Sequence, residues 1–320
     1  MARCQQLARF SERSGSIHRT FLSAPMRDVH REITAWLQSL DAEVSIDAAG
    51  NVRGFYAGTH SQAPRLLIGS HLDTVPNAGA YDGILGVVLA VCLLEALDRE
   101  KLPFAIEVVG FSEEEGVRFG EPFIGSGALV GRLDEHLLNR QDSKGVSVRQ
   151  AIRDFGLRPE DISEARVHSD TLAYLEFHIE QGPVLESLTR PLGAVEAIAG
   201  QSRLEFTFLG KSNHAGTTPM HLRRDAVAAA AEWISAVEQF AQNVPGLVAT
   251  VGKIEARPGA TNVIAGEVLL TLDVRHSSDE VRARAVQDLI RKAEEIVQRR
   301  RLSMSRRMFS AKSIGSFGAA

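Results

Sequence analysis

Residues 65–94, RLLIGSHLDTVPNAGAYDGILGVVLAVCLL, decide the fold of this chain. The opening RLLIGSH predicts a buried strand, and Ile84–Leu97 predicts a buried helix. A proline and glycines between them prevent the stretch from being a single helix. The connecting loop nevertheless holds three ionisable side chains, His71, Asp73 and Asp82. Their place between two apolar segments points to a functional loop.

Strands and helices alternate along the chain to about residue 195. A helix over 26–40 is predicted from apolar residues spaced by three and four. The other predicted elements are a short strand within 48–58, a strand within 103–116 and a strand within 172–182. This order predicts an α/β fold with a mainly parallel sheet.

The pattern changes after about residue 195. We predict antiparallel strands within 193–210, a helix over 225–240, a strand over 266–276 and a long helix over 278–300. Ser277 and Glu280 suggest a capping box at the start of the last helix. A sheet with two helices forms a compact α+β unit of its own.

These patterns predict three regions. The first domain covers residues 1–197, the α+β domain covers 198–305, and residues 306–320 form an irregular tail. The tail is basic, rich in small residues and without clear periodicity, so we expect it to add no layer to either domain.

Composition excludes several classes of protein. The chain has 320 residues, with 36 basic against 40 acidic residues and a net charge of −4, so no nucleic-acid surface or membrane patch is expected. Two cysteines are too few for a disulfide framework. The N-terminus lacks the apolar region of a signal peptide, and the apolar run 84–94 is too short to span a bilayer. We therefore expect a soluble, cytoplasmic protein.

Histidines and carboxylates follow predicted strands or precede a predicted helix in four places. These are His71 with Asp73, then Asp82, then Glu113–Glu115, and finally His178 with Glu180. Ligands bind at the carboxyl ends of strands in α/β sheets, so the four groups can converge. Their nitrogen and oxygen atoms suit zinc, manganese or a similar divalent ion.

Within such a site the residue types suggest different tasks. Asp82 can bridge two metals with its two oxygens, and a glutamate that is not a ligand can take a proton from water. Asp73 is expected to accept the second N–H of the His71 ring.

Each group also has a structural alternative. A histidine after a strand is commonly a hydrogen-bonded structural residue, and a run of glutamates is commonly a solvated helix start. Asp82 could cap the helix that begins at Gly83. These alternatives weaken when all four groups occupy matched places in one α/β layer.

The second domain has polar residues that could meet a substrate. His214 lies in the loop 210–220, GKSNHAGTTPM, which is either a surface turn or a device that delivers a histidine. Asn262 and Arg275 lie on or beside predicted strands. Arginine suits a substrate carboxylate, and its alternative is a surface ion pair.

In these motifs the chain resembles the allantoate amidohydrolase and N-carbamoyl-L-amino-acid hydrolase family, within the two-metal aminoacylase and carboxypeptidase superfamily. The motifs are GSHLDTV…YDG, EEEGVRFG, FHIEQGPVLE, SNHAGTTPM and TNVIAG…LDVRH, and they span roughly residues 20–300 in order. The resemblance implies hydrolysis of a carbamoyl or ureido C–N bond that releases ammonia and carbon dioxide. It also implies two divalent ions, zinc or manganese with cobalt or nickel as alternatives, and a homodimer formed through an inserted lid domain.

The resemblance also assigns roles in the first, catalytic domain. His71, Asp82, Glu115 and His178 would bind the metals, with Asp82 as the bridge and Glu115 on the second ion. Glu114 would be the general base.

In the lid domain the resemblance implies contacts with the substrate. His214 would polarise the scissile carbonyl, reaching in from a partner subunit. Gln201, Asn262 and Arg275 would orient the carboxylate and ureido groups.

The sequence departs from the family at its end. No histidine follows His276, and the GHDA-like segment that supplies a last metal ligand in the family is not found. We therefore expect a truncated or frameshifted copy. Two further hypotheses stay open, a peptidase or aminoacylase of the same superfamily and an inactive remnant.

Overall fold

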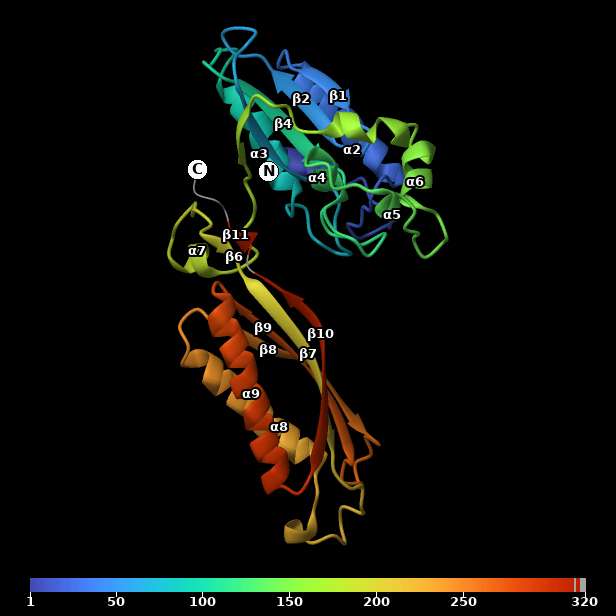
Figure 1. The fold of residues 1–320 in the computed structure, drawn as a ribbon, viewed down its shortest axis with the longest axis vertical. Coiled ribbons are helices and arrows are strands. Elements are labelled where there is room, and N and C mark those ends of the chain that lie inside the picture. The colour runs from blue at the N-terminus through green and yellow to red at the C-terminus, as the bar shows by residue number, and fades with distance from the viewer. Residues whose placement is uncertain (314, 317–320) are drawn as a thin grey trace. The chain divides into compact units, whose positions relative to one another are not determined.

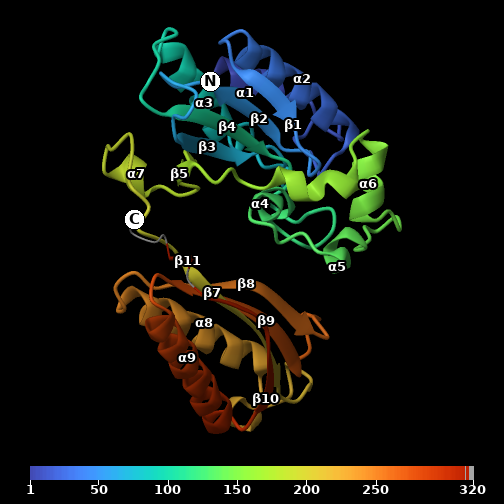
Figure 2. The same cartoon turned by 45° about the horizontal axis from the view of Figure 1, so that its top comes forward.

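The computed structural model describes residues 1–313 and 315–316 (Figures 1 and 2). The chain divides into two compact units, Met1–Thr189 and Arg190–Ala320. The division falls before the boundary that we predicted after residue 197.

The first unit is built on a five-stranded sheet. In spatial order its strands are β1 (Glu43–Ile46), β2 (Val52–Tyr56), β4 (Ala105–Phe111), β3 (Arg65–His71) and β5 (Thr171–Leu175). β3 is parallel to both β4 and β5, and only β2 runs against its two neighbours. The prediction of an α/β fold with a mainly parallel sheet is therefore confirmed.

The first unit has two longer helices that pack on this sheet and several shorter ones. They are α1 (Ala2–Leu7), α2 (Ala24–Gln38), α3 (Ile84–Ala96), α4 (Ile124–Leu129), α5 (Glu135–Leu138), α6 (Val148–Asp154), η1 (Pro159–Ala165) and α7 (Val184–Ser187). α2 packs on β1 and β2, and α3 packs on β3 and β4, in one continuous apolar core. Within the described residues, no helix combines the length and the apolar character needed to cross a membrane.

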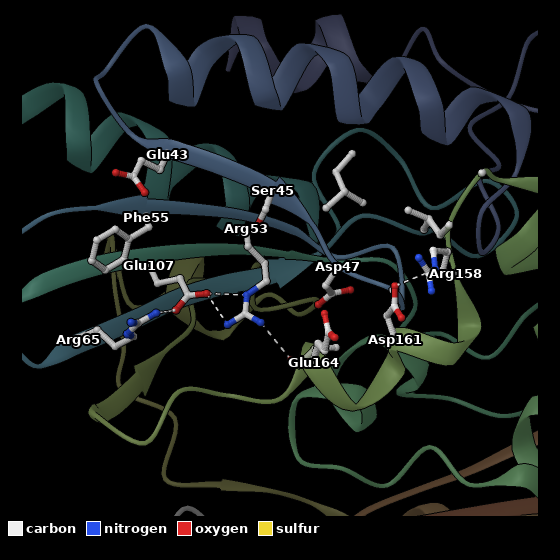
Figure 3. Close-up of a pocket in the computed structure, with 15 residues that line it drawn as sticks. Glu43, Ser45, Asp47, Arg53, Phe55, Arg65, Glu107, Arg158, Asp161 and Glu164 are labelled. Carbon is white, nitrogen blue, oxygen red and sulfur yellow. Dashed lines mark hydrogen bonds and ion pairs between the residues drawn. The ribbon is translucent and has the colours of Figure 1, made fainter.

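The opposite face of the sheet carries a row of ion pairs (Figure 3). The Glu107 carboxylate is buried, and it accepts hydrogen bonds from Arg53 Nε at 2.6 Å and from Arg65 Nη1 at 2.8 Å. A cavity of about 520 Å³ borders this row, between β1, β2, β4 and the segment 156–165. Because two guanidinium groups flank one carboxylate, the buried charge is compensated.

The second unit is an antiparallel sheet with two helices. Its strands and helices are β6 (Ala197–Ile198), β7 (Gly200–Leu209), η2 (Met220–Leu222), α8 (Ala226–Gln242), β8 (Val248–Arg257), β9 (Glu267–His276), α9 (Asp279–Arg299), β10 (Ser303–Lys312) and β11 (Gly315–Ser316). The main sheet has the order β10-β7-β9-β8. Buried residues alternate along β7 and β9, and their inner face packs against α8 and α9 around Trp233.

The prediction of an irregular tail is wrong for residues 306–312. They belong to β10, which pairs along its length with β7. The strand lies at the sheet edge and is largely exposed, so its sequence lacks the apolar alternation that identifies a half-buried strand. Main-chain pairing holds it, and Arg306 and Arg307 form ion pairs with Glu294 and Glu205. Residues 314 and 317–320 of the predicted tail lie outside the described residues.

The predicted capping box at α9 is also wrong. The N-cap is Ser278, whose hydroxyl accepts from the N–H of Val281, so Ser277 precedes the cap. Because Ser277 and Ser278 are adjacent, the sequence alone does not show which of the two is the N-cap.

The cap can be tested with the two adjacent serines. Ser278→Ala removes the acceptor for the Val281 N–H and should lower the free energy of unfolding of the second unit by about 1 kcal/mol. Ser277→Ala is the matched control and should leave it unchanged. Urea unfolding followed by circular dichroism measures both, and equal effects of the two substitutions would refute the assignment.

His30 of α2 predicts a pH dependence of stability. The ring is buried against Phe155, its nitrogens have no hydrogen-bond partner among the described residues, and burial lowers its pKa from 6.5 to about 4. Between these values the unfolded chain binds a proton that the folded chain excludes. The free energy of unfolding should therefore fall by about 3 kcal/mol as the pH decreases from 6.5 to 4.

The measurement is urea unfolding across this pH range, compared between the wild type and His30→Leu. The variant should lose this part of the pH dependence, whereas His60→Gln, which removes an exposed imidazole, should keep it. Parallel pH curves for the wild type and His30→Leu would contradict the prediction.

Candidate metal centre

Three adjacent strands end at one edge of the first unit's sheet. β3 ends at His71, β4 is followed by Glu113–Glu115, and β5 is followed by His178. Because β3 is parallel to both neighbours, these segments leave the sheet at the same edge. Asp82 joins them from the loop that ends at α3.

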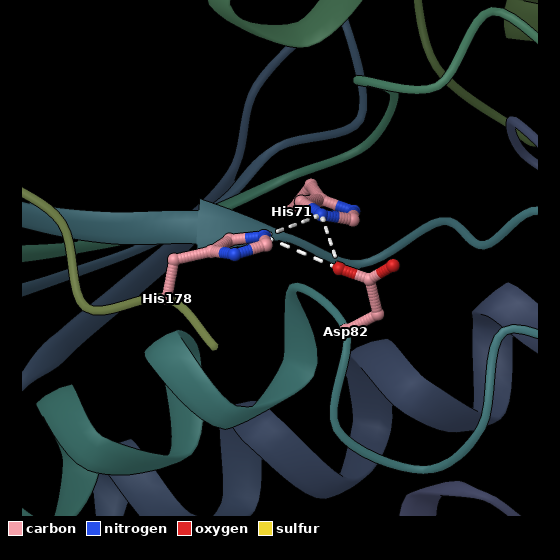
Figure 4. A group of neighbouring side chains, drawn as sticks. All are labelled: His71, Asp82 and His178. Atoms are coloured by element: carbon pink, nitrogen blue, oxygen red, sulfur yellow. Dashed lines mark hydrogen bonds and ion pairs between the residues drawn. The ribbon is translucent and has the colours of Figure 1, made fainter. Parts of the chain in front are cut away.

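His71, Asp82 and His178 face one another (Figure 4). The two Nε2 atoms are 3.4 Å apart, and Asp82 Oδ1 lies 3.3 Å from His178 Nε2 and 3.8 Å from His71 Nε2. Metal–ligand bonds of about 2.1 Å in tetrahedral geometry place ligand atoms about 3.4 Å apart. The three atoms thus have the spacing of one face of a zinc-like coordination shell.

Backbone carbonyls fix the orientation of both histidines. His71 Nδ1 lies 3.0 Å from the carbonyl oxygen of Asp73, and His178 Nδ1 lies 2.8 Å from that of Ile179. A proton on Nδ1 donates to each carbonyl, and in the neutral ring this leaves the Nε2 lone pair for a metal. Both imidazoles are therefore oriented as ligands.

Asp73 has a different main contact from the expected one. Its carboxylate oxygen lies 3.4 Å from His71 Nδ1, farther than its own carbonyl oxygen. The carboxylate instead accepts the N–H of Glu114 at 2.9 Å and the N–H of Glu115 at 3.0 Å. Asp73 therefore connects the loop after β3 to the loop after β4.

The structure decides against two of the structural alternatives. Glu113–Glu115 belong to no helix, and Glu113 is only 1% exposed. Asp82 does not cap α3, since the N-cap is Gly83 and no side chain bonds there. Glu114 and Glu115 form a second group with His71, in which the possible ligand atoms all lie within 4.8 Å of one another.

Electrostatics favour a cation at this place. Burial, with the charge of Asp73, raises the pKa of Glu113 to about 9, and burial, with Glu114, raises the pKa of Glu115 to about 7. Burial also raises the pKa of Glu114. At His71, burial lowers the pKa of the imidazole, but the hydrogen bond and the charge of Asp73 outweigh burial and raise this pKa to about 9. The raised carboxyl pKa values mean that the ionised carboxylates are disfavoured without a neighbouring cation, so a divalent ion would stabilise them.

Gln181 was not identified from the sequence. Its side-chain amide donates to both oxygens of Asp82, at 3.1 and 3.0 Å, and its backbone has a φ of 56°. The available signal was its position three residues after His178 in the same loop. A glutamine has no charge to attract notice beside a histidine and two glutamates.

The structure places His214 beside Asn262. The two meet where His214 pairs with Val263 in an isolated antiparallel bridge and Ala215 N–H donates to the Asn262 carbonyl at 2.9 Å. The polar loop thus packs on the segment that precedes β9.

The structure also places Gln201 opposite Arg275, in the pairing of β7 with β9. Arg275 donates to both oxygens of Asp273, at 3.0 and 3.1 Å. The alternative of a surface ion pair therefore describes Arg275 in this structure.

Comparison with known proteins identifies similar hydrolases. A family model described as "Peptidase family M20/M25/M40" matches residues 67–303. Allantoate deiminase 2 of Glycine max is 38% identical over 95% of this chain and 68% of its own length. N-carbamoyl-L-amino acid amidohydrolase of Geobacillus stearothermophilus is 38% identical over 91% of this chain and 72% of its own length.

A solved structure agrees with these relatives. The amidase of the hydantoinase/carbamoylase family from Burkholderia multivorans has a TM-score of 0.89 and 30% identity, covering 99% of this chain and 77% of its own. The resemblance drawn from the motifs is therefore confirmed.

Gly83 provides a test of the metal centre. A Cβ at this position would lie 2.5 Å from His71 Nδ1, and the backbone has a φ of 66°. Gly83→Ala should displace the imidazole and weaken zinc or manganese binding at least tenfold. Isothermal titration of metal-free protein measures the affinity.

Gly79→Ala is the matched control, because Gly79 has a φ of 80° with open space around its Cβ position. It carries similar backbone strain without the contact to the ring. Equal loss of affinity in both variants would show that strain alone, and not the position of His71, is responsible.

Proposed function

Since the chain belongs to peptidase family M20/M25/M40, we propose that it is a metal-dependent hydrolase of a linear ureido or amide C–N bond. The proposed substrate is allantoate or an N-carbamoyl-L-amino acid, as the names of its relatives suggest. The observation that carries the proposal is the spacing of His71, Asp82 and His178, which suits a bound divalent ion.

We assign the metal ligands as follows. His71, Asp82 and His178 would hold one ion, and Glu115 together with Asp82 would hold a second. Nitrogen and oxygen ligands suit zinc, manganese, cobalt or nickel. When bound, such ions polarise a carbonyl group and lower the pKa of a water molecule.

The protein's own residues would carry the proton transfers and position the substrate. Glu114 takes a proton from the attacking water and delivers it to the leaving nitrogen. The water oxygen bonds to the ureido carbon as the C–N bond breaks. The carbamate product then decomposes to ammonia and carbon dioxide.

Residues of the second unit would bind the substrate. His214 would polarise the scissile carbonyl, and Gln201, Asn262 and Arg275 would hold the ureido and carboxylate groups. Arg275 is bound to Asp273 in this structure, so a substrate carboxylate would have to compete with that pair or share the guanidinium.

A second candidate is a peptidase or aminoacylase, which the family description favours. Both reactions need the same metal ligands and a general base, so the first unit suits either. The difference lies in the group that the second unit recognises.

Other expectations stay predictions. These are a homodimer formed through the second unit, a small-molecule substrate without nucleic-acid or membrane partners, and a cytoplasmic location.

The test is ammonia release from allantoate and N-carbamoyl-L-amino acids by metal-free protein supplied with each ion in turn. Wild-type protein should turn over at least one of these substrates and bind two ions. Glu114→Gln should reduce kcat by roughly 10²- to 10⁴-fold while retaining metal. Asp82→Asn should reduce metal content as well. Glu121→Gln, a glutamate of the same loop paired with Arg140, is the control and should be fully active.

The outcomes separate the hypotheses. Release of amino acids from dipeptides or N-acyl amino acids, without ammonia from ureido compounds, would favour the second candidate. Weak metal binding with no hydrolysis of either class would mean a non-catalytic protein and refute the proposal.

A further inference from the structure

We propose that Glu113, which the roles above leave unassigned, is a positioning residue. Together with Asp73 it forms a buried carboxylate clamp, defined as these two side chains, that fixes the backbone of Glu114 and Glu115. The inference rests on the proposed function for the roles of those two glutamates. The clamp itself rests on hydrogen bonds in the first unit.

Three successive N–H groups point at the clamp. The Asp73 carboxylate accepts from Glu114 with one oxygen at 2.9 Å and from Glu115 with the other at 3.0 Å. Glu113 Oε1 accepts from the N–H of Gly116 at 2.6 Å. Consecutive N–H groups that converge in this way form a concave anion site, which the protein fills with its own carboxylates.

The carbonyl side of the same turn is held too. The Glu113 carbonyl accepts from Gly125 N–H at 3.2 Å, and the Glu114 carbonyl accepts from Phe123 N–H at 3.2 Å. The backbone around both functional glutamates is therefore bonded on its N–H and its C=O side. Its shape sets the direction in which their side chains leave the chain.

Stability alone does not account for Glu113. The residue is 1% exposed, and its Oε2 atom has no hydrogen-bond partner among the described residues. A buried carboxyl group with one oxygen unpartnered costs free energy, which the hydrogen bond from Gly116 to the other oxygen offsets only in part. Such a group is more readily explained by a role at the site.

The structure gives less support to Glu113 as a metal ligand. Two possible metal-ligand groups are found among the described residues, His71 with Asp82 and His178, and His71 with Glu114 and Glu115, and neither contains Glu113. Its Oε1 atom is already committed to Gly116. Glu113 therefore acts through the backbone.

Three substitutions at this position test the clamp. Glu113→Gln keeps the length and an oxygen acceptor for Gly116, whereas Glu113→Ala removes the acceptor and Glu113→Asp places it one methylene short. Hydrogen exchange in metal-free protein is the first readout. The amides of residues 114–116 should exchange at least tenfold faster in the Ala and Asp variants and return near the wild-type rate in the Gln variant.

Metal affinity and kinetics are the second readout. The Ala and Asp variants should bind zinc or manganese 10- to 100-fold more weakly, and the Gln variant should recover to within about threefold. In turnover the loss should appear in kcat with little change in KM, since the substrate contacts are not altered. Glu121→Ala is the control for removing a carboxylate from the same loop.

Each result has a defined meaning. Equal damage by Gln and Ala would show that the acceptor for the Gly116 N–H is not what matters, and wild-type exchange in all variants would show that Glu113 does not hold this backbone; either result would overturn the proposal. If Glu113→Ala does not fold, the comparison of Asp with Gln decides. Because exchange is measured without metal or substrate, the clamp can fail or hold independently of the proposed function.

Discussion

The parallel pairing of β3 with both of its neighbours is the constraint on which the candidate site depends. His71 lies opposite Phe111 of β4, and Ile68 lies opposite Leu175 of β5. β3 and β4 therefore end at the same level, whereas β5 ends three residues earlier, and His178 lies three residues beyond that end. A shift of one residue in β3 would turn His71 to the other face, so the apolar packing that fixes the register also fixes the face on which His71 lies.

Buried carboxylates occur in two places in the first unit, and they are compensated differently. Glu107 is bonded to two arginines on one face of the sheet. At the carboxyl ends of β3 and β4, Asp73 and Glu113 accept hydrogen bonds from backbone N–H groups. Among the described residues neither forms an ion pair with an arginine or a lysine, and His71 Nδ1 lies 3.4 Å from Asp73. The charge of Glu107 is thus neutralised by its two arginines, whereas an added cation would stabilise the ionised carboxylates of Asp73 and Glu113. This contrast is what a metal site at the carboxyl ends of β3 and β4 would produce.

Much of the fold could be predicted from the sequence, because apolar periodicity reports burial. The strand Arg65–His71 and the helix from Ile84 are found where the pattern placed them. β10 was missed because an exposed edge strand is held by main-chain hydrogen bonds, which leave little trace in the side-chain pattern. The start of α9 was misplaced by one residue because two adjacent serines are equally good caps by type.

The site could be predicted only in part. Residue types and their places after strands indicated which groups gather, but not which atom meets which. The main contact of Asp73 is with backbone N–H groups of another loop, and this long-range pairing has no local signature. The amide of Gln181 was missed for a related reason, since a neutral side chain reveals its role only when its partner Asp82 is seen.

Two residues next to Asp82 have a positive φ. Gly83 follows it with a φ of 66°, and Gln181, which donates to its carboxylate, has a φ of 56°. A non-glycine residue in this region costs roughly 1–2 kcal/mol, so surrounding structure must hold Gln181 there. Its two hydrogen bonds to Asp82 supply part of that restraint. A cation bound to both oxygens would compete with the amide, and the released bonds would allow Gln181 to relax. Metal binding at Asp82 would therefore be coupled to the conformation of this loop through one carboxylate.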